Sequence, residues 1–303
     1  MLLIAVALLW LTLPLWPAVR ELRRPTDDQP LPVNQGNAAD AAEPFALAHA
    51  GPAPHVTTTT NVEGLAAELG PRDSTVAVQC PAAFRIDSPM GAGARDPGRA
   101  HVSHLRAHTL IVAASCDAEL SSPVSITLLP GAELRVAQAP VIVVGDSPAD
   151  AQGQAAQRRA AALPESFSDV EGATWQPLQG WWHTAADARI RKGERIKGDV
   201  LAKRVVVEEG AVVEGSIKAS VDLVLYAHAR VSGNCVAPRV RVGLGCEIQG
   251  CVVADNTALL AHGCSVGAPD SAASVVATDL EMCPGARVYG GITAHRAARV
   301  AGG

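Results

Sequence analysis

Short runs of alternating apolar and polar residues dominate the second half of the chain and recur at a nearly constant interval. In the clearest run Val213, Gly215, Ile217 and Ala219 occupy every second position, so one face of a short strand is expected to point inward. One copy cannot bury this face alone, whereas stacked copies form a continuous narrow core. The predicted core positions of all copies are Ile190, Ile196, Val200, Val207, Val213, Ile217, Leu225, Val231, Val242, Ile248, Val252, Val288 and Ile292.

A glycine, or once a histidine, stands three residues after the first aliphatic position of each copy. These predicted coil corners are Gly193, Gly210, His228, Gly245, Gly263 and Gly285, separated by steps of 17, 18, 17, 18 and 22 residues. Glycine suits a corner because positive φ costs it least, and His228 is interpreted as a tolerated turn residue rather than a catalyst. The period predicts an all-β fold, a β-solenoid over residues 182–294, in which the break between Val266 and Met282 is either a loop or a bulged coil.

The cadence G-x-x-V-x-G-x-I-x-A, seen at residues 210–219 and again at 193–202 and 285–294, resembles the bactofilins. These are bacterial polymer-forming cytoskeletal proteins, and the resemblance covers about residues 182–294. It implies a right-handed β-helix of triangular section, with 17–18 residues per coil, that polymerises end to end without nucleotide. It also implies a scaffold for cell-wall or envelope machinery at the inner membrane.

The left-handed hexapeptide acyltransferases are the alternative family. They place a small residue after each aliphatic position, whereas Lys197 and Glu214 follow Ile196 and Val213 here. This pattern favours the bactofilins.

Strand-like patterns also fill most of residues 56–148, with one short helix expected between Asn61 and Gly70. Leu128, Gly131 and Leu134 repeat the spacing of the solenoid, so this mostly-β segment is either a second β-helical unit or a β-sandwich-like one. The pattern then breaks, and residues 149–181 are interpreted as a linker or insertion. Residues 295–303 are interpreted as a tail.

The first nineteen residues carry no charged side chain and would span ~28 Å as a helix, close to the hydrocarbon thickness of a bilayer. A secretory signal is the other interpretation, but it needs basic residues before the apolar run, whereas Arg20, Arg23 and Arg24 follow it. Residues 1–24 are therefore predicted to be a transmembrane helix, and residues 25–55 a flexible tether. The positive-inside rule predicts a single-pass inner-membrane protein with the bulk of the chain in the cytoplasm.

Composition narrows the classes of partner. Aromatic residues make up 3% of the chain and the net charge is -5, which suits a narrow aliphatic core and gives no general attraction to nucleic acid. Residues 189–204 carry seven basic and two acidic side chains, and residues 242–286 carry five acidic and no Lys or Arg side chains. Opposite charge at the two ends would steer copies toward head-to-tail contact, whereas the bactofilin resemblance implies filaments in which like ends meet, and both charge groups could also be solvated faces. Val212, outside the alternating core positions, is expected to face solvent.

Chemistry-bearing motifs are sparse. No phosphate-binding glycine loop, nucleophile elbow or H-E-x-x-H is present. His101, His104 and His108 with Asp117 suggest a metal site, because spacings of three and four residues suit one face of a helix. The residues around them are instead typical of loops and strands, which favours solvent-exposed histidines. The seven cysteines form no C-x-x-C pair and are predicted to be small buried hydrophobes. No catalytic, cofactor or metal residue is therefore predicted.

Three tryptophans, Trp175, Trp181 and Trp182, precede the first coil. They would suit either a sugar ring or the cover of an open solenoid end, and we favour the cover because aromatic rings bury a large area.

Together these patterns predict a membrane-anchored, self-associating scaffold that forms a homo-oligomer or polymer and organises envelope-synthesis proteins. An enzyme or glycan-binding β-helix in envelope polysaccharide assembly is the alternative.

Overall fold

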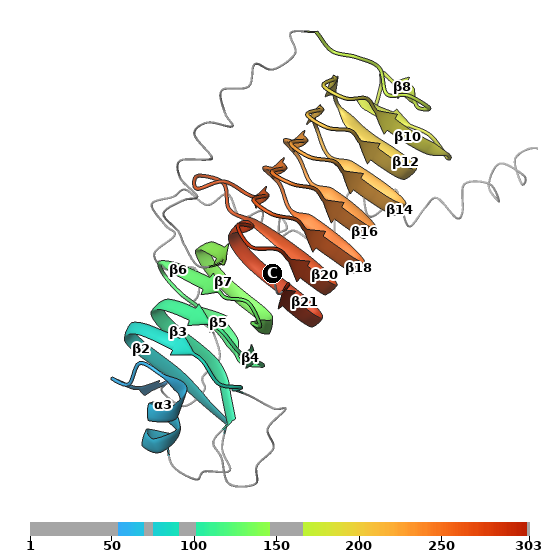
Figure 1. Ribbon diagram of the computed structural model, residues 1–303. Helices are drawn as coiled ribbons and strands as arrows, with labels where there is room; N and C mark the ends of the chain where they lie inside the picture. The colour runs from blue at the N-terminus through green and yellow to red at the C-terminus, as the bar shows by residue number, and fades with distance from the viewer. Residues whose placement is uncertain (1–53, 70–74, 91–100, 146–165, 302–303) are drawn as a thin grey trace, which may run out of the picture. The chain divides into compact units, whose positions relative to one another are not determined.

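Parallel strands wind into a β-solenoid of about ten turns in this computed structural model (Figure 1). The structure describes residues 54–69, 75–90, 101–145 and 166–301, and the predicted anchor and most of the tether lie outside them. Among the described helices, none is long and apolar enough to cross a membrane. The described residues form two stacks of coils, a shorter one up to residue 145 and a longer one from residue 166 onward.

The longer stack contains most of the predicted repeat. Its strands are β8 (Thr174–Gln176), β9 (Trp181–His183), β10 (Asp187–Ile190), β11 (Arg195–Lys197), β12 (Asp199–Val207), β13 (Val212–Glu214), β14 (Ile217–Leu225), β15 (Arg230–Val231), β16 (Cys235–Val242), β17 (Glu247–Ile248), β18 (Val252–Leu260), β19 (Ser265–Val266), β20 (Ala273–Met282) and β21 (Arg287–Val300).

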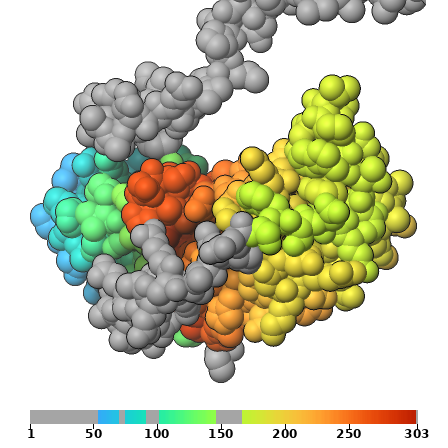
Figure 2. Space-filling model, turned by 90° about the horizontal axis from the view of Figure 1, so that it is seen from above, coloured from blue at the N-terminus to red at the C-terminus, as the bar shows by residue number. Residues whose placement is uncertain are grey.

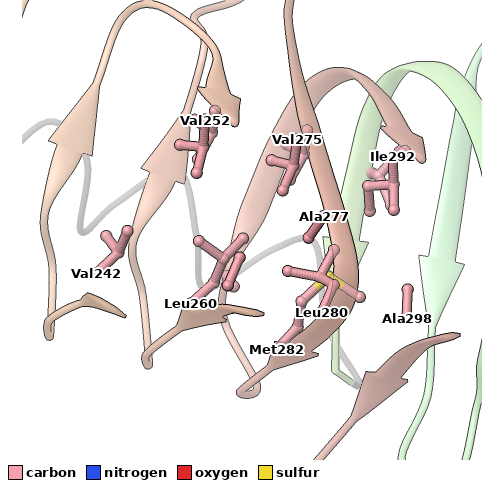
Figure 3. Packing of buried hydrophobic residues seen from close by; sticks show 14 of the residues in the cluster. Val242, Val252, Leu260, Val275, Ala277, Leu280, Met282, Ile292 and Ala298 are labelled. Atoms are coloured by element: carbon pink, nitrogen blue, oxygen red, sulfur yellow. The ribbon is translucent and has the colours of Figure 1, made fainter. Parts of the chain in front are cut away.

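Each coil contributes three strand segments, so the stack has three parallel faces. On one face Val200, Ile217, Cys235 and Val252 follow one another in register, and Val275 and Ile292 continue the row. Figure 3 shows Val252, Val275 and Ile292 side by side in successive coils. All thirteen residues predicted for the core are at most 1% exposed.

All six predicted corner residues have positive φ, and His228, at 60°, is the one such non-glycine among the described residues. At Gly210, with φ of 70°, an added Cβ would meet no atom within 4 Å, so backbone conformation alone favours glycine there. Gly215 serves a different corner. A Cβ there would lie 2.4 Å from the carbonyl oxygen of Gly198 in the preceding coil, so close approach between coils requires glycine.

The break between Val266 and Met282 is a loop. Strand β20 keeps the register of its neighbour, because Val275 pairs with Val252 and Met282 with Leu260. The extra residues are accommodated at the turn before β20, where Ala268 and Ser271 form an isolated bridge. The insertion therefore leaves the core rows unbroken.

The shorter stack coils in the same way, so the described part of residues 56–148 is solenoidal and not β-sandwich-like. Phe84, Leu110, Ile126 and Ile142 form one row across four successive coils. Its strands are β1 (His55–Val56), β2 (Thr75–Ile86), β3 (His101–Val112), β4 (Ser115–Cys116), β5 (Glu119–Ser121), β6 (Ser125–Leu128) and β7 (Glu133–Val144).

A short helix, α3 (Val62–Leu69), lies at the start of the shorter stack. Asn61 caps it, since its side-chain oxygen accepts a 2.8 Å hydrogen bond from the backbone N–H of Gly64. Leu65 and Leu69 are buried in the same continuous core as the strands. The helix therefore covers the first coil of this stack.

The two stacks meet through β7 and β21, which pair antiparallel. Each is the last strand of its stack, so the stacks join by like ends. Figure 2 shows the orange and red residues of the last coils lying between the green residues of the shorter stack and the yellow residues of the first coils.

Two expectations need correction. Residues 295–300 belong to β21 and complete the last coil, because Ala298 and Val300 continue the inward rows of Leu280 and Met282. Val212 does occupy an outward row, but it is only 8% exposed. It lies in register between Arg195 and Arg230, whose long aliphatic stems can cover a small neighbour.

Candidate assembly surfaces

The interior of the first coil of the longer stack would be open without residues 167–176. This segment crosses all three faces of the coil. The backbone N–H of Ser168 donates to the Arg195 carbonyl at 2.8 Å, and Glu171 exchanges two 2.9 Å hydrogen bonds with Arg189. Strand β8 then pairs antiparallel with β9. Residues 149–181 are thus more than a linker, because their described part closes one end of the stack.

Two of the predicted tryptophans take part in this closure. Trp182 is buried in the inward row above Val200, and the ring centroids of Trp175 and Trp182 lie 5.2 Å apart. Trp175 also lies against Gly198, where an added Cβ would come within 2.7 Å of the ring. Trp181 is half-buried on β9. Trp175 and Trp182 therefore act as a cover for the first coil.

At the opposite end, β7 seals the last coil. Its inward residues Leu134, Ala137 and Ile142 stand opposite Ala298, Ile292 and Val288, and each of the six is at most 1% exposed. Parts of the same chain thus cover the described ends of both stacks. Helix α3 covers the first coil of the shorter stack, residues 167–176 cover the first coil of the longer stack, and the contact of β7 with β21 covers both last coils.

Ion pairs run along the stacking axis on the outer surface. Arg189 pairs with Glu208 at 3.1 Å and Lys192 with Glu209 at 2.6 Å, each time between successive coils. Arg239 donates to Asp222 at 2.9 Å and holds the pKa of that carboxyl below its usual value. Much of the basic charge in residues 189–204 is therefore paired within the chain, which weakens the head-to-tail steering expected from the sequence.

The histidines considered for a metal cluster lie on strand β3. His101 and His108 are exposed, whereas His104 contacts Glu119 at 2.5 Å. Asp117 lies near Arg135 instead, at 3.8 Å. Within the described ranges, no group of three His, Cys, Asp or Glu side chains is arranged to hold a metal ion.

All seven cysteines carry reduced thiols, and most of them are buried. Burial raises the pKa of Cys116 to about 12 and that of Cys246 to about 11, and it raises the pKa of Cys235 still further. Such thiols stay protonated at neutral pH and are poor nucleophiles. They serve as core residues.

Part of the longer stack matches a known protein family. Residues 170–253 match the family model described as "Bactofilin: Polymer-forming cytoskeletal". Residues 170–253 are a bactofilin domain. A comparison with curated proteins and one with solved structures each found no match. The bactofilin family is structural and cytoskeletal rather than enzymatic, which confirms the prediction of a non-enzymatic domain.

The bactofilin domain includes residues 170–176, which cover the first coil, and the coils up to the start of β18. The solenoid itself continues to Val300. Neither β7 nor β21 lies within the matched residues. The cover of the first coil is thus largely part of the family domain, and the cover of the last coil is not.

Proposed function

We propose that this protein is a membrane-anchored, self-associating scaffold that organises envelope or cell-wall machinery. The observation that carries the proposal is the polymer-forming bactofilin domain on a β-solenoid. We take the solenoid to be a right-handed β-helix. The core and corner residues serve to stack its coils and provide no catalytic site.

The anchor is supported by the sequence alone. The uncharged run of residues 1–19, followed by Arg20, Arg23 and Arg24, fits one transmembrane helix with the remainder on the cytoplasmic side. The tether of residues 25–55 would let the solenoid sample ~30 Å from the bilayer if it behaves as a coil. A scaffold held in this way concentrates its copies at one surface, which favours association between weakly interacting subunits.

The first experiment tests the anchor. The full chain and a chain lacking residues 1–24 are expressed in bacteria, and membrane and soluble fractions are compared. The full chain should sediment with membranes and the shortened chain should not. A reporter fused after Gly303 should be active in the cytoplasm, and activity in the periplasm would contradict the orientation.

The second experiment tests self-association. The chain lacking residues 1–24 is examined by analytical ultracentrifugation and negative-stain microscopy across a range of protein concentrations. Filaments or extended bundles support the scaffold. Discrete trimers would instead favour the acyltransferase class.

A further inference from the structure

The contact between β7 and β21 has an unusual consequence for a polymer-forming fold. Strand β21 closes the longer stack, and its outer edge carries backbone groups that a further strand could pair with. In this chain β7 takes that edge, in eight register pairs from Arg287–Val143 to Arg299–Glu133. The pairing extends over all three faces of the last coil, so no face of that coil is left for another copy.

Several contacts besides the register pairs strengthen the contact between β7 and β21, which we call the seam. The backbone N–H of Val144 donates to Ala286 at 3.0 Å, and the N–H of Val300 donates to Ala132 at 3.1 Å. On the outer surface the guanidinium of Arg299 donates to a carboxylate oxygen of Glu133 at 3.0 and 3.1 Å. The core runs without interruption from one stack into the other.

Both partners in the seam lie outside the residues that match the bactofilin model. The shorter stack is therefore an addition to the family domain, placed on one end of the solenoid. Antiparallel pairing of two last coils is also the geometry in which like ends of two separate copies would meet.

We infer that the shorter stack, formed by the described residues between 54 and 145, is an end cap that blocks growth through the last coil of the longer stack until the β7–β21 seam opens. The partner that competes with β7 for the edge of β21 is a second copy of this chain. This inference rests on the proposed self-association, and it adds that association through this end requires separation of the two stacks.

A disulfide across the seam tests the inference in the chain lacking only residues 1–24. Glu133→Cys with Arg299→Cys places two thiols on register partners whose side chains already meet, and paired antiparallel strands bring Cα atoms within disulfide reach. Lys192→Cys with Glu209→Cys is the matched control, since it replaces an exposed ion pair between coils away from the seam. Mass spectrometry identifies the bonds, and sedimentation measures assembly in oxidised and reduced samples.

We expect the seam disulfide to form within single chains and to abolish assembly, with recovery on reduction, while the control disulfide leaves assembly unchanged. Equal assembly of the oxidised and reduced seam variants would overturn the cap, as would bonds that form only between chains. If neither the wild type nor the reduced seam variant assembles under any condition, the proposed polymer fails, and a cap that controls its growth fails with it; equal assembly above zero would overturn the cap alone.

A charge reversal tests the cap in the other direction. Glu133→Arg faces Arg299 with a like charge, whereas Glu209→Arg makes the same change beside Lys192. The first variant should assemble about two- to five-fold faster than the wild type, and the second should not. The double variant Glu133→Arg with Arg299→Glu should restore the wild-type rate. Equal acceleration by both single variants would show that surface charge, and not the seam, controls assembly.

Discussion

Ile217 offers the sharpest test of the stacked core. Its side chain is fully buried and lies in register between Val200 and Cys235 of the neighbouring coils, both fully buried as well. Neighbouring coils are fixed by backbone pairing on three faces, so they cannot close a space left by a shorter side chain. The cost of truncation should therefore combine lost burial with a lasting cavity.

A graded series gives the magnitude. Ile217→Val should lower the free energy of unfolding by about 0.5–1.5 kcal/mol, and Ile217→Ala by about 2–5 kcal/mol. Ile217→Asp adds an unpaired buried carboxylate, which costs several kcal/mol more and approaches the ~5–15 kcal/mol that stabilises a typical domain. Lys218→Asp is the control, because Lys218 is the exposed neighbour on the same strand. It should change stability by less than about 0.5 kcal/mol.

Urea denaturation followed by circular dichroism measures the totals. Hydrogen exchange then locates the loss, which should be largest in β14 and its neighbours β12 and β16, since each coil contacts only adjacent coils. Equal damage from Lys218→Asp and Ile217→Ala would refute the assigned register. Uniform loss of protection over the whole chain would refute the local character of the coils.

Three further predictions concern corners, thiols and pH. Gly215→Ala should destabilise more than Gly210→Ala in thermal melts, because only the first forces a Cβ into a neighbouring carbonyl; the reverse order would contradict the assigned roles. In native protein at pH 8, iodoacetamide should modify half-buried Cys283 well before Cys235, because burial raises the pKa of the Cys235 thiol more than that of the Cys283 thiol. Peptide mapping measures the order of modification, and modification of Cys235 first would contradict the prediction. Asp222→Asn should lower stability at pH 7, because the folded protein stabilises the charged carboxylate of Asp222 and so lowers its pKa. The difference in stability from the wild type should shrink below about pH 4, where the wild-type carboxylate becomes protonated. A difference that stays constant down to pH 2 would exclude this linkage.

The longer stack could be predicted from sequence because its rows repeat at a nearly fixed step. Val200, Ile217 and Val252 were all predicted core positions, and the register places them in one row. The signal of the shorter stack was weaker. Leu110, Ile126 and Ile142 follow one another at 16-residue steps, but the preceding step from Phe84 is 26 residues long. Two equal steps are too few to define a period.

Other features lie beyond what local patterns contain. The β7–β21 seam joins strands more than 140 residues apart in sequence, and an open strand edge can pair with many other edges. Likewise, arginines from the coils before and after Val212 lie in register with it, and its own position in the alternation says nothing of them. The interaction surfaces of this protein therefore follow from its tertiary structure, although its coils follow from its sequence.

The parallel ladders also determine how the protein would respond to mechanical load. In the longer stack, the hydrogen bonds between coils point along the stacking axis, and each coil is held only by the two beside it. Tension along that axis would load the bonds of one coil boundary together, whereas tension on a chain end would peel strands away one after another. A solenoid of this kind would resist stretching until one boundary fails and would then lengthen in steps of about one coil.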